Sequence, residues 1–223
     1  MLQTIGEVLP LAVGIAISPI PIIAAILMLL SPHARATSVG FLLGWVLGIV
    51  VAVVVFTLLS GLIPAADPNA SKPVAGVIKI ILGVLLLLLA FRQWRSRPRA
   101  GEDAALPKWM GAIDSMNAGR GLALGFVLAA VNPKNLLLAA SAGVAVGTAG
   151  LSLGSTVLVV AIVTLIAAIS VLVPVIGYLV ASTAMRAPLD ALRRWLVAHN
   201  AAVMTVLLLV IGVVMIGKGI ASF

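Results

Sequence analysis

The sequence contains no cysteine and few charged residues, and acidic residues are scarcest of all. Without cysteine the chain forms no disulfide and offers no thiolate to a metal ion, although this absence identifies no cellular compartment. Charged residues make up only 9% of the 223 residues, and only one loop provides a long polar stretch. We therefore expect no separate aqueous domain.

Motifs of several enzyme classes are also missing. The sequence has no His-Glu-x-x-His zinc motif, no aspartate pair within an apolar segment, no Gly-x-Ser-x-Gly nucleophile elbow and no Walker motif. We therefore expect no catalytic residues, no metal site and no cofactor. Transport driven by ATP hydrolysis in this chain is likewise not expected.

What the sequence does contain is apolar: 63% of its residues are hydrophobic and the mean hydropathy is +1.29. About 20 apolar residues in a helix cross the ~30 Å hydrocarbon layer of a membrane. The sequence therefore predicts an all-α polytopic membrane protein with six transmembrane helices. The expected spans are Thr4–Leu30, Val39–Ile63, Val74–Phe91, Gly121–Gly147, Leu153–Thr183 and Ala201–Gly217.

Basic residues gather in alternate connections between these spans. Arg35 follows the first span, and further basic residues follow the third and fifth: Arg92, Arg95, Arg97, Arg99, Lys108, Arg120, Arg186, Arg193 and Arg194. The opposite connections carry only Lys72 and Lys218, near span ends. Because basic loops are retained in the cytoplasm, we expect both termini to face outward. The net charge of +8 is then a topology signal rather than a nucleic-acid-binding surface.

The tetrapeptide Asn132-Pro133-Lys134-Asn135 interrupts the fourth span. Pro133 removes a backbone donor and breaks the helix, while Lys134 places a cation ~20 Å inside the span. A lysine near the centre of a membrane helix costs roughly 2.5–3.5 kcal/mol. Such a residue is usually tolerated only beside a partner, a ligand or water, so this tetrapeptide is a candidate substrate-binding site.

The first span contains a similar break, Ser18-Pro19-Ile20-Pro21, and both breaks are expected near the membrane midplane. Paired breaks at corresponding places mark the binding sites of many secondary transporters, so Ser18, Pro19 and Pro21 join the candidate substrate-binding residues. Half-helix N-termini at the breaks would attract an anion, and Lys134 would add a full positive charge. The simpler alternative is that the prolines only kink the helices.

The halves of the chain correspond in a second place, because the third and sixth spans share the central pairs Gly83-Val84 and Gly212-Val213. Each half has three spans, so the second half enters the membrane from the opposite side. We therefore expect inverted-topology repeats at residues 1–92 and 121–223, joined by a basic amphipathic cytoplasmic loop at residues 93–120. Small residues at 40, 44 and 48 would allow close helix packing within or between subunits.

Two charged residues near the outward-facing ends of the spans are candidates for coupling transport to a proton or for an accessory role. Glu7 lies in the first span and either pairs with Lys79 of the third span or meets water. Lys79 is close enough to the outer interface to extend its ammonium there. Both are also the titratable groups nearest to the outer mouth for a coupling proton.

Two apolar stripes in the connections have two possible roles. They are anchors on the inner leaflet, or they collect substrate from it, with Trp109 and Met110 as the candidate access residues. The stripes consist of Trp109, Met110, Ile113 and Met116, and of Leu189, Leu192 and Leu196.

These motifs resemble a known group of proteins. Asn132-Pro133-Lys134 is similar to the NPK signature of the LysE superfamily of small exporters, and Ser18-Pro19-Ile20-Pro21 is similar to its proline-rich first break, often PGP. The length, the basic middle loop and the Ala/Val-rich composition resemble its actinobacterial GAP branch, the sulfolipid-1-addressing or peptidoglycolipid-addressing proteins. The resemblance covers essentially the whole chain. It implies export, of amino acids in the superfamily and of cell-envelope glycolipids in the branch.

One departure from the resemblance affects the expected substrate. Ile20 stands where PGP has glycine, which disfavours an amino-acid site that needs close backbone approach. We expect a transporter that moves an anionic or glycosylated cell-envelope lipid from the inner leaflet outward, since the spans carry few polar residues. The alternatives are export of a small amino acid or metabolite, a channel, or an accessory protein of a lipid export complex.

The expected location is the bacterial inner (plasma) membrane, with a multi-pass topology. Expected partners are membrane lipids, including a glycolipid substrate, and either a second copy of the chain or a lipid-synthesis or export protein. No nucleic-acid partner is expected.

Overall fold

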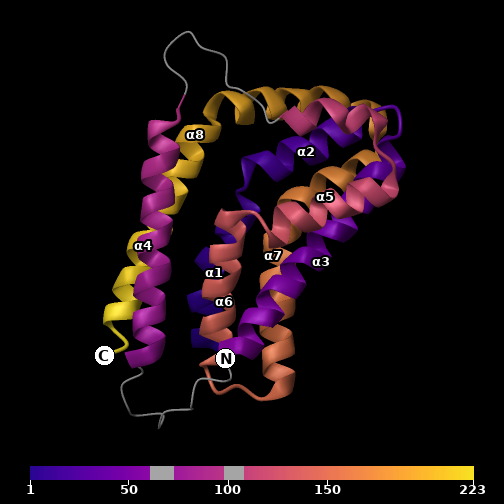
Figure 1. The fold of residues 1–223 in the computed structure, drawn as a ribbon. Helices are drawn as coiled ribbons and strands as arrows, with labels where there is room; N and C mark the ends of the chain where they lie inside the picture. Colours follow the sequence, from indigo (N-terminus) through magenta and orange to yellow (C-terminus); the bar gives the residue numbers. More distant parts are fainter. Residues whose placement is uncertain (61–72, 98–107) are drawn as a thin grey trace.

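The computed structural model describes residues 1–60, 73–97 and 108–223, and its regular elements are all helices (Figure 1). The helices are α1 (Leu2–Ala16), α2 (Pro19–Leu30), α3 (Ala34–Ser60), α4 (Pro73–Arg95), the 3-10 helix η1 (Lys108–Ser115), α5 (Ala118–Ala130), α6 (Pro133–Gly147), α7 (Leu153–Val180) and α8 (Ser182–Ile220). The all-α class predicted from the sequence is therefore confirmed.

Within the described residues, four helices are long and apolar enough to cross a membrane: α3, α4, α7 and α8. The predicted first and fourth spans are each a bent pair of helices: α1 and α2 meet at 49°, and α5 and α6 at 62°. Counting each bent pair as one span gives up to six crossings. Each second helix begins with a proline, Pro19 or Pro133, because proline needs no hydrogen-bond partner in a first helical turn.

Helices α3 and α5 pack with their backbones close together because glycines face the partner helix. A Cβ atom on Gly44 would collide with the Leu122 carbonyl, and one on Gly125 with the Phe41 carbonyl. Gly40 and Gly48 of α3 also face the backbone of α5. The small-residue spacing of α3 therefore serves packing within the chain.

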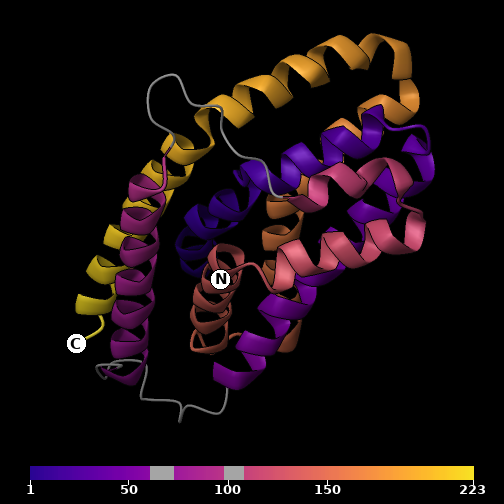
Figure 2. The same ribbon diagram turned by 45° about the horizontal axis from the view of Figure 1, so that its top comes forward.

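Glycines also join α4 to the second half of α8, and these two helices lie side by side in both ribbon views (Figures 1 and 2). A Cβ atom on Gly83 would lie 2.8 Å from the Gly212 carbonyl oxygen, and one on Gly212 would lie 3.0 Å from that of Gly83. Gly76 and Gly219 face each other in the same way, at 2.9 and 2.8 Å. The Gly-Val pairs that the sequence shares between halves thus meet in the fold.

Helix α8 differs from the sequence-based expectation. The predicted sixth span, Ala201–Gly217, and the amphipathic stripe before it form one helix of 39 residues. The first part of α8 crosses the end of the bundle beside α2, and the second part runs along α4 (Figure 2). No glycine or proline occurs between Leu189 and Ile211, so nothing in this stretch ends the helix.

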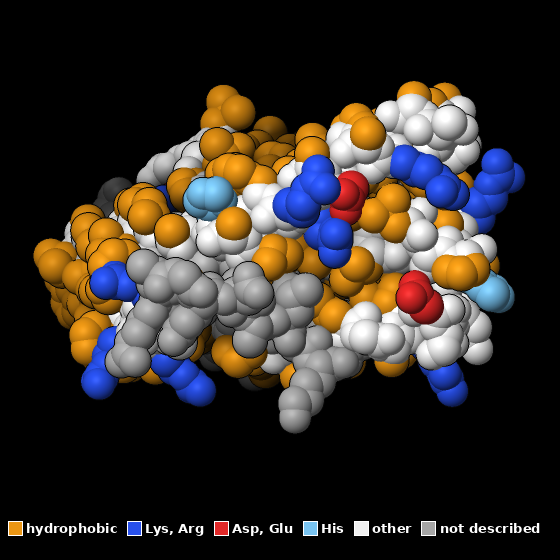
Figure 3. All heavy atoms as spheres, turned by 90° about the horizontal axis from the view of Figure 1, so that it is seen from above, with side chains coloured by type: hydrophobic (Ala, Val, Ile, Leu, Met, Phe, Trp, Pro, Cys, Tyr) orange, Lys and Arg blue, Asp and Glu red, His pale blue; other side chains and the backbone are white. Residues whose placement is uncertain are grey.

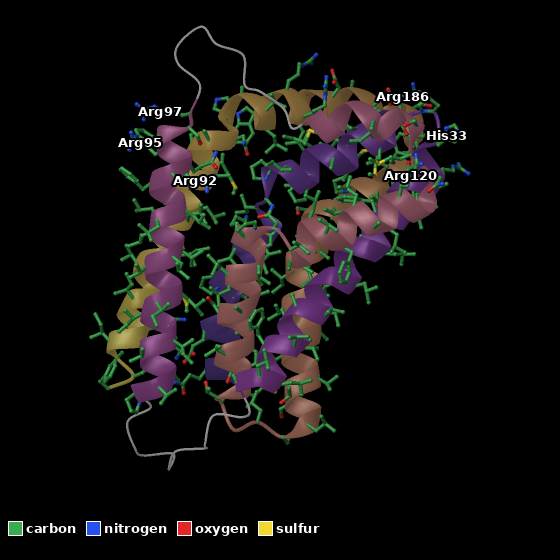
Figure 4. All side chains as sticks on the ribbon, in the orientation of Figure 1. His33, Arg92, Arg95, Arg97, Arg120 and Arg186 are labelled. Atoms are coloured by element: carbon green, nitrogen blue, oxygen red, sulfur yellow. The ribbon has the colours of Figure 1, made fainter. Side chains whose placement is uncertain are left out.

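The chain termini and the basic connections lie at opposite ends of the helix bundle. Figure 1 places both termini at the lower end, and Figure 4 places five labelled arginines and His33 at the upper end. Figure 3 looks onto that upper end and shows Lys and Arg side chains spread over it. The described basic connections thus share one end, as predicted, while Lys72 and Arg99 lie outside the described residues.

Candidate functional site

The two proline breaks meet inside the protein. Ser18, Lys134 and Asn135 are buried, with exposed fractions of 2%, 4% and 1%. The Lys134 Nζ donates a hydrogen bond to the Ser18 Oγ at 2.6 Å, and the Ser18 Oγ lies 3.0 Å from the Asn135 Oδ1. We call these three residues the central cluster, and they are three of the seven predicted substrate-binding residues.

The Lys134 ammonium binds the carboxyl end of α1. It donates to the Gly14 carbonyl at 2.7 Å and to the Ile17 carbonyl at 3.3 Å, so that with Ser18 it has three acceptors. The end of a helix carries partial negative charge on its unpaired carbonyls, which favours an ammonium there. The cation that the sequence places inside the membrane is therefore paired with backbone dipoles.

The proline-rich break explains why these carbonyls are available. Ile17 O would normally accept from the N–H of residue 21, but Pro21 has none. The Ser18 N–H bonds Ala16 O, which leaves Gly14 O without its usual partner. Pro19 similarly releases Ile15 O, which accepts from the Ser18 hydroxyl at 2.6 Å. Pro19 and Pro21 are buried and act on the cluster through the backbone.

The second break is arranged differently. The Asn135 Nδ2 donates to Leu128 O at 2.9 Å, a carbonyl that is free because the Asn132 N–H bonds Val127 O. The Asn132 Oδ1 accepts the backbone N–H of Lys134 at 3.1 Å and so caps α6. Pro133 is exposed and Asn132 partly exposed. These two residues shape the start of α6, whereas Asn135 belongs to the central cluster.

The half-helix N-termini offer fewer amide donors than the sequence analysis anticipated. Among the first three residues of α2, Pro19 and Pro21 have no N–H, which leaves only Ile20. In α6, Pro133 has none and Asn132 already accepts the N–H of Lys134. The principal positive group at the breaks is therefore the Lys134 ammonium itself.

The described helices form apolar grooves along the surface of the bundle, two of which matter here. One of about 600 Å³ lies between α1 and α8, lined by Pro10, Val13, Gly14 and Ile17 and by α8 residues between 202 and 211. The other, of about 690 Å³, lies between residues 46–58 of α3 and 153–172 of α7. We call them the α1/α8 groove and the α3/α7 groove. Only the first is lined by residues that bind Lys134.

Glu7 and Lys79 lie together at the end of the bundle that bears the termini. The Lys79 Nζ is 3.8 Å from the Glu7 Oε2, so the pairing that the sequence left open is present at the long limit of an ion pair. The Lys218 Nζ donates to the Glu7 carbonyl at 3.1 Å. Sequence reasoning treated Lys218 only as a charge near a span end, because nothing in the sequence shows that α8 returns to α1.

The predicted leaflet-access residues do not form an outward stripe in the described residues. Met110 and Ile113 are buried, with exposed fractions of 6% and 2%, where η1 packs against α2. The side chain of Trp109 lies outside the described part of the structure. In the second stripe, Leu189 and Leu196 are buried and Leu192 is exposed. The periodic spacing of apolar residues identified these helix faces, but most of their side chains pack against other parts of the protein rather than facing the membrane surface.

Comparison with known proteins gives one result. A family model described as Sap, sulfolipid-1-addressing protein, matches residues 8–221, a range that includes both breaks and the complete central cluster. Searches of curated proteins and of solved structures found no match. Since the family model covers nearly the whole chain, this protein belongs to the sulfolipid-1-addressing protein family.

Proposed function

We propose that the protein is a secondary transporter that translocates an anionic or glycosylated amphipathic lipid across the membrane. The observation that carries the proposal is the Lys134 ammonium, buried where two broken helices meet. Among the described residues, no carboxylate forms an ion pair with it. An anionic headgroup is the ligand that would complement this charge.

When a lipid binds, a headgroup oxygen would replace one of the hydrogen-bond acceptors of the Lys134 ammonium. In the present conformation the Gly14 and Ile17 carbonyls and the Ser18 hydroxyl occupy the positions that headgroup oxygens would take. A charged oxygen forms a stronger hydrogen bond with an ammonium than a neutral carbonyl does. A phosphate or sulfate oxygen would therefore displace one carbonyl and keep the ammonium satisfied throughout.

Family membership and the surface of the bundle support a lipid rather than a small solute. The family is described by the addressing of a sulfolipid, which is an anionic amphipathic molecule. The α1/α8 groove is lined by apolar residues and reaches the break. An amino-acid exporter would require a polar chamber for a zwitterion, and export of such a solute is the outcome that would replace this proposal.

The proposal includes an inverted repeat of the two halves. In each half a broken helix pair is followed by two long helices, and α1 and α5 approach their breaks from opposite ends of the bundle (Figure 1). Corresponding elements touch each other: the first break meets the second through Ser18 and Asn135, and Gly83 meets Gly212. Contacts between corresponding elements are expected near a twofold axis, and they support two halves that rock about the central cluster.

The test is lipid translocation by the full-length protein in vesicles. Fluorescent phosphatidylglycerol, an anionic lipid, and fluorescent phosphatidylcholine, a zwitterionic lipid, are followed by chemical bleaching of the outer leaflet. We expect the protein to accelerate phosphatidylglycerol exchange about tenfold more than phosphatidylcholine exchange, a preference equal to ~1.4 kcal/mol of differential binding. Lys134→Met, assayed below its melting temperature, should abolish the preference, whereas Lys134→Arg should retain part of it.

Two results would count against the proposal. Equal exchange rates for the two lipids in the wild-type protein would show that the transporter does not select an anionic headgroup. Efflux of radiolabelled amino acids without lipid exchange would instead support the small-solute exporter.

A further inference from the structure

We infer that the α1/α8 groove is the lateral entry through which the acyl chain of an anionic lipid brings its headgroup to Lys134. The inference rests on the proposed function, because it names the route by which the same site is reached. It assigns one occupant to the groove, a lipid whose chain lies along α1 and α8 and whose charged group lies at Ile17.

The lining and exposure of the groove suit a hydrocarbon chain. Every lining residue is apolar, and the exposed fractions of Ile17, Val206 and Val210 are 43%, 62% and 52%. From Pro10 to Ile17, α1 rises about 10 Å at 1.5 Å per residue. One leaflet of the ~30 Å hydrocarbon layer is ~15 Å deep, so the groove extends over about two thirds of the depth that a single acyl chain occupies.

The groove is continuous with the central cluster. Gly14 and Ile17 line it, and the carbonyls of these two residues are acceptors for Lys134. The bond to Ile17 is the longest of the three Lys134 bonds, at 3.3 Å against 2.7 and 2.6 Å. A headgroup oxygen arriving along the groove would therefore meet the most weakly held acceptor first and would take its place.

Charge beyond the end of the groove that holds Ile17 fits the same occupant, because α1 and the second part of α8 run in opposite directions and Ala202 lies at that end (Figure 1). The first lining residue of α8, Ala202, follows the part of α8 that crosses the basic end of the bundle. On that part, Arg193 and Arg194 share the single carboxylate of Asp190, which leaves a net positive charge. Anionic headgroups are attracted to such an end, and their chains then lie beside the opening of the groove.

The α3/α7 groove provides a matched control. It has similar size and a mainly apolar lining that includes three threonines, but none of its lining residues belongs to the central cluster or bonds Lys134. Val206 of the α1/α8 groove and Val157 of the α3/α7 groove are exposed to nearly the same degree, 62% and 60%. Tryptophan at either position fills a groove from its lipid-facing side and leaves the buried core unchanged.

The experiment uses the full-length protein in vesicles that contain phosphatidylglycerol with a photoactivatable diazirine in its acyl chain. Cross-linked peptides are quantified by mass spectrometry, with zwitterionic phosphatidylcholine carrying the same diazirine as the comparison lipid. We expect labelling near Ile17 and Val206 to exceed labelling at the similarly exposed Leu209, outside the groove, by about tenfold, and only with the anionic lipid. Val206→Trp should remove this excess, and Val157→Trp should leave it unchanged.

Uniform labelling of the groove and Leu209 would overturn the inference, because it would mean that the groove holds only bulk lipid. So would an excess that survives Val206→Trp. Wild-type labelling needs no variant to fold, and it measures binding rather than transport. Specific labelling without translocation would therefore reject the proposed function and keep the groove as a lipid site.

Discussion

Pro19 and Pro21 remove two backbone N–H donors from the first break. The carbonyl groups that are left without these donors accept hydrogen bonds from the side chains of Ser18 and Lys134 instead. Ser18 binds the Ile15 carbonyl, and Lys134 binds the Ile17 carbonyl and also Gly14. A carbonyl that is buried in a membrane protein without a partner costs several kcal/mol, because no water is present to replace the bond. The buried lysine is therefore a structural part of the break as well as its positive charge.

Replacing Lys134 by methionine should lower the melting temperature. Methionine keeps most of the side-chain volume but leaves two carbonyls and one hydroxyl without their donor, at about 1–3 kcal/mol each. The lower cost of inserting a neutral residue favours membrane insertion but not packing of the helices afterwards. Circular dichroism of the purified variant during heating measures the change.

Lys79→Met is the control for this prediction. Its ammonium is 3.8 Å from Glu7 and makes no bond to the breaks in the described structure, so its loss should change the melting temperature little. If Lys134→Met melts at the wild-type temperature, its hydrogen bonds to α1 are not important for stability.

At this scale the sequence identified the residues but not their partners. A lysine and two prolines inside apolar segments predict a break and a buried charge from insertion costs alone. The three acceptors of Lys134 lie 116, 117 and 120 positions away, and only the fold brings them near. An incoming anion at Lys134 could therefore be predicted, whereas the carbonyls at the end of α1 that accept hydrogen bonds from its ammonium could not.

At the scale of the helices, glycines determine which helices pack most closely. Gly125→Ala should destabilise the protein, because the new Cβ atom would collide with the Phe41 carbonyl and lie 2.8 Å from the backbone nitrogen of Trp45. Overpacking of this kind costs about 1–3 kcal/mol, more than the ~1 kcal/mol that alanine gains in helix propensity. Thermal unfolding of the variant in detergent tests the prediction.

Gly217→Ala is the matched substitution in open space. A Cβ atom at Gly217 meets nothing within 4 Å, so only the gain in helix propensity remains and stability should rise slightly. Equal effects of the two substitutions would show that close approach of α3 and α5 does not limit stability.

Helix boundaries were predicted correctly at the two prolines and also at Leu30, Gly147 and Leu153, but not before Ala201. Pro19 and Pro133 begin α2 and α6 as their chemistry requires. The stretch just before Ala201 contains no proline. Its lower hydropathy indicated a connection between spans, but in the structure it is part of the single helix α8. The stripe containing Met110 was also ambiguous, because an apolar face is equally suited to lipid and to a neighbouring helix.

For the whole molecule, the separation of basic residues from the termini predicts a membrane orientation. A cysteine introduced at Ala66 should react with an impermeant thiol reagent from outside the cell, and cysteines at Ala105 and Ala187 should not. Ala66 and Ala105 lie outside the described residues, whereas Ala187 is exposed at the start of α8. The absence of native cysteine leaves no background labelling.

Labelling of Ala187→Cys from outside would reverse the proposed orientation. Labelling of Ala66→Cys and Ala187→Cys from the same side would contradict the placement of the basic connections and the termini at opposite ends of the bundle.

Because the second break supplies the donor for acceptors of the first, the first break cannot be completed until late in synthesis. Ribosomes complete α1 long before they reach Lys134, which lies 117 positions after Ile17. Until then the carbonyls at the end of α1 lack the ammonium that binds them in the finished protein. The first break therefore reaches its final hydrogen bonding only after the second half has been made and has packed against it.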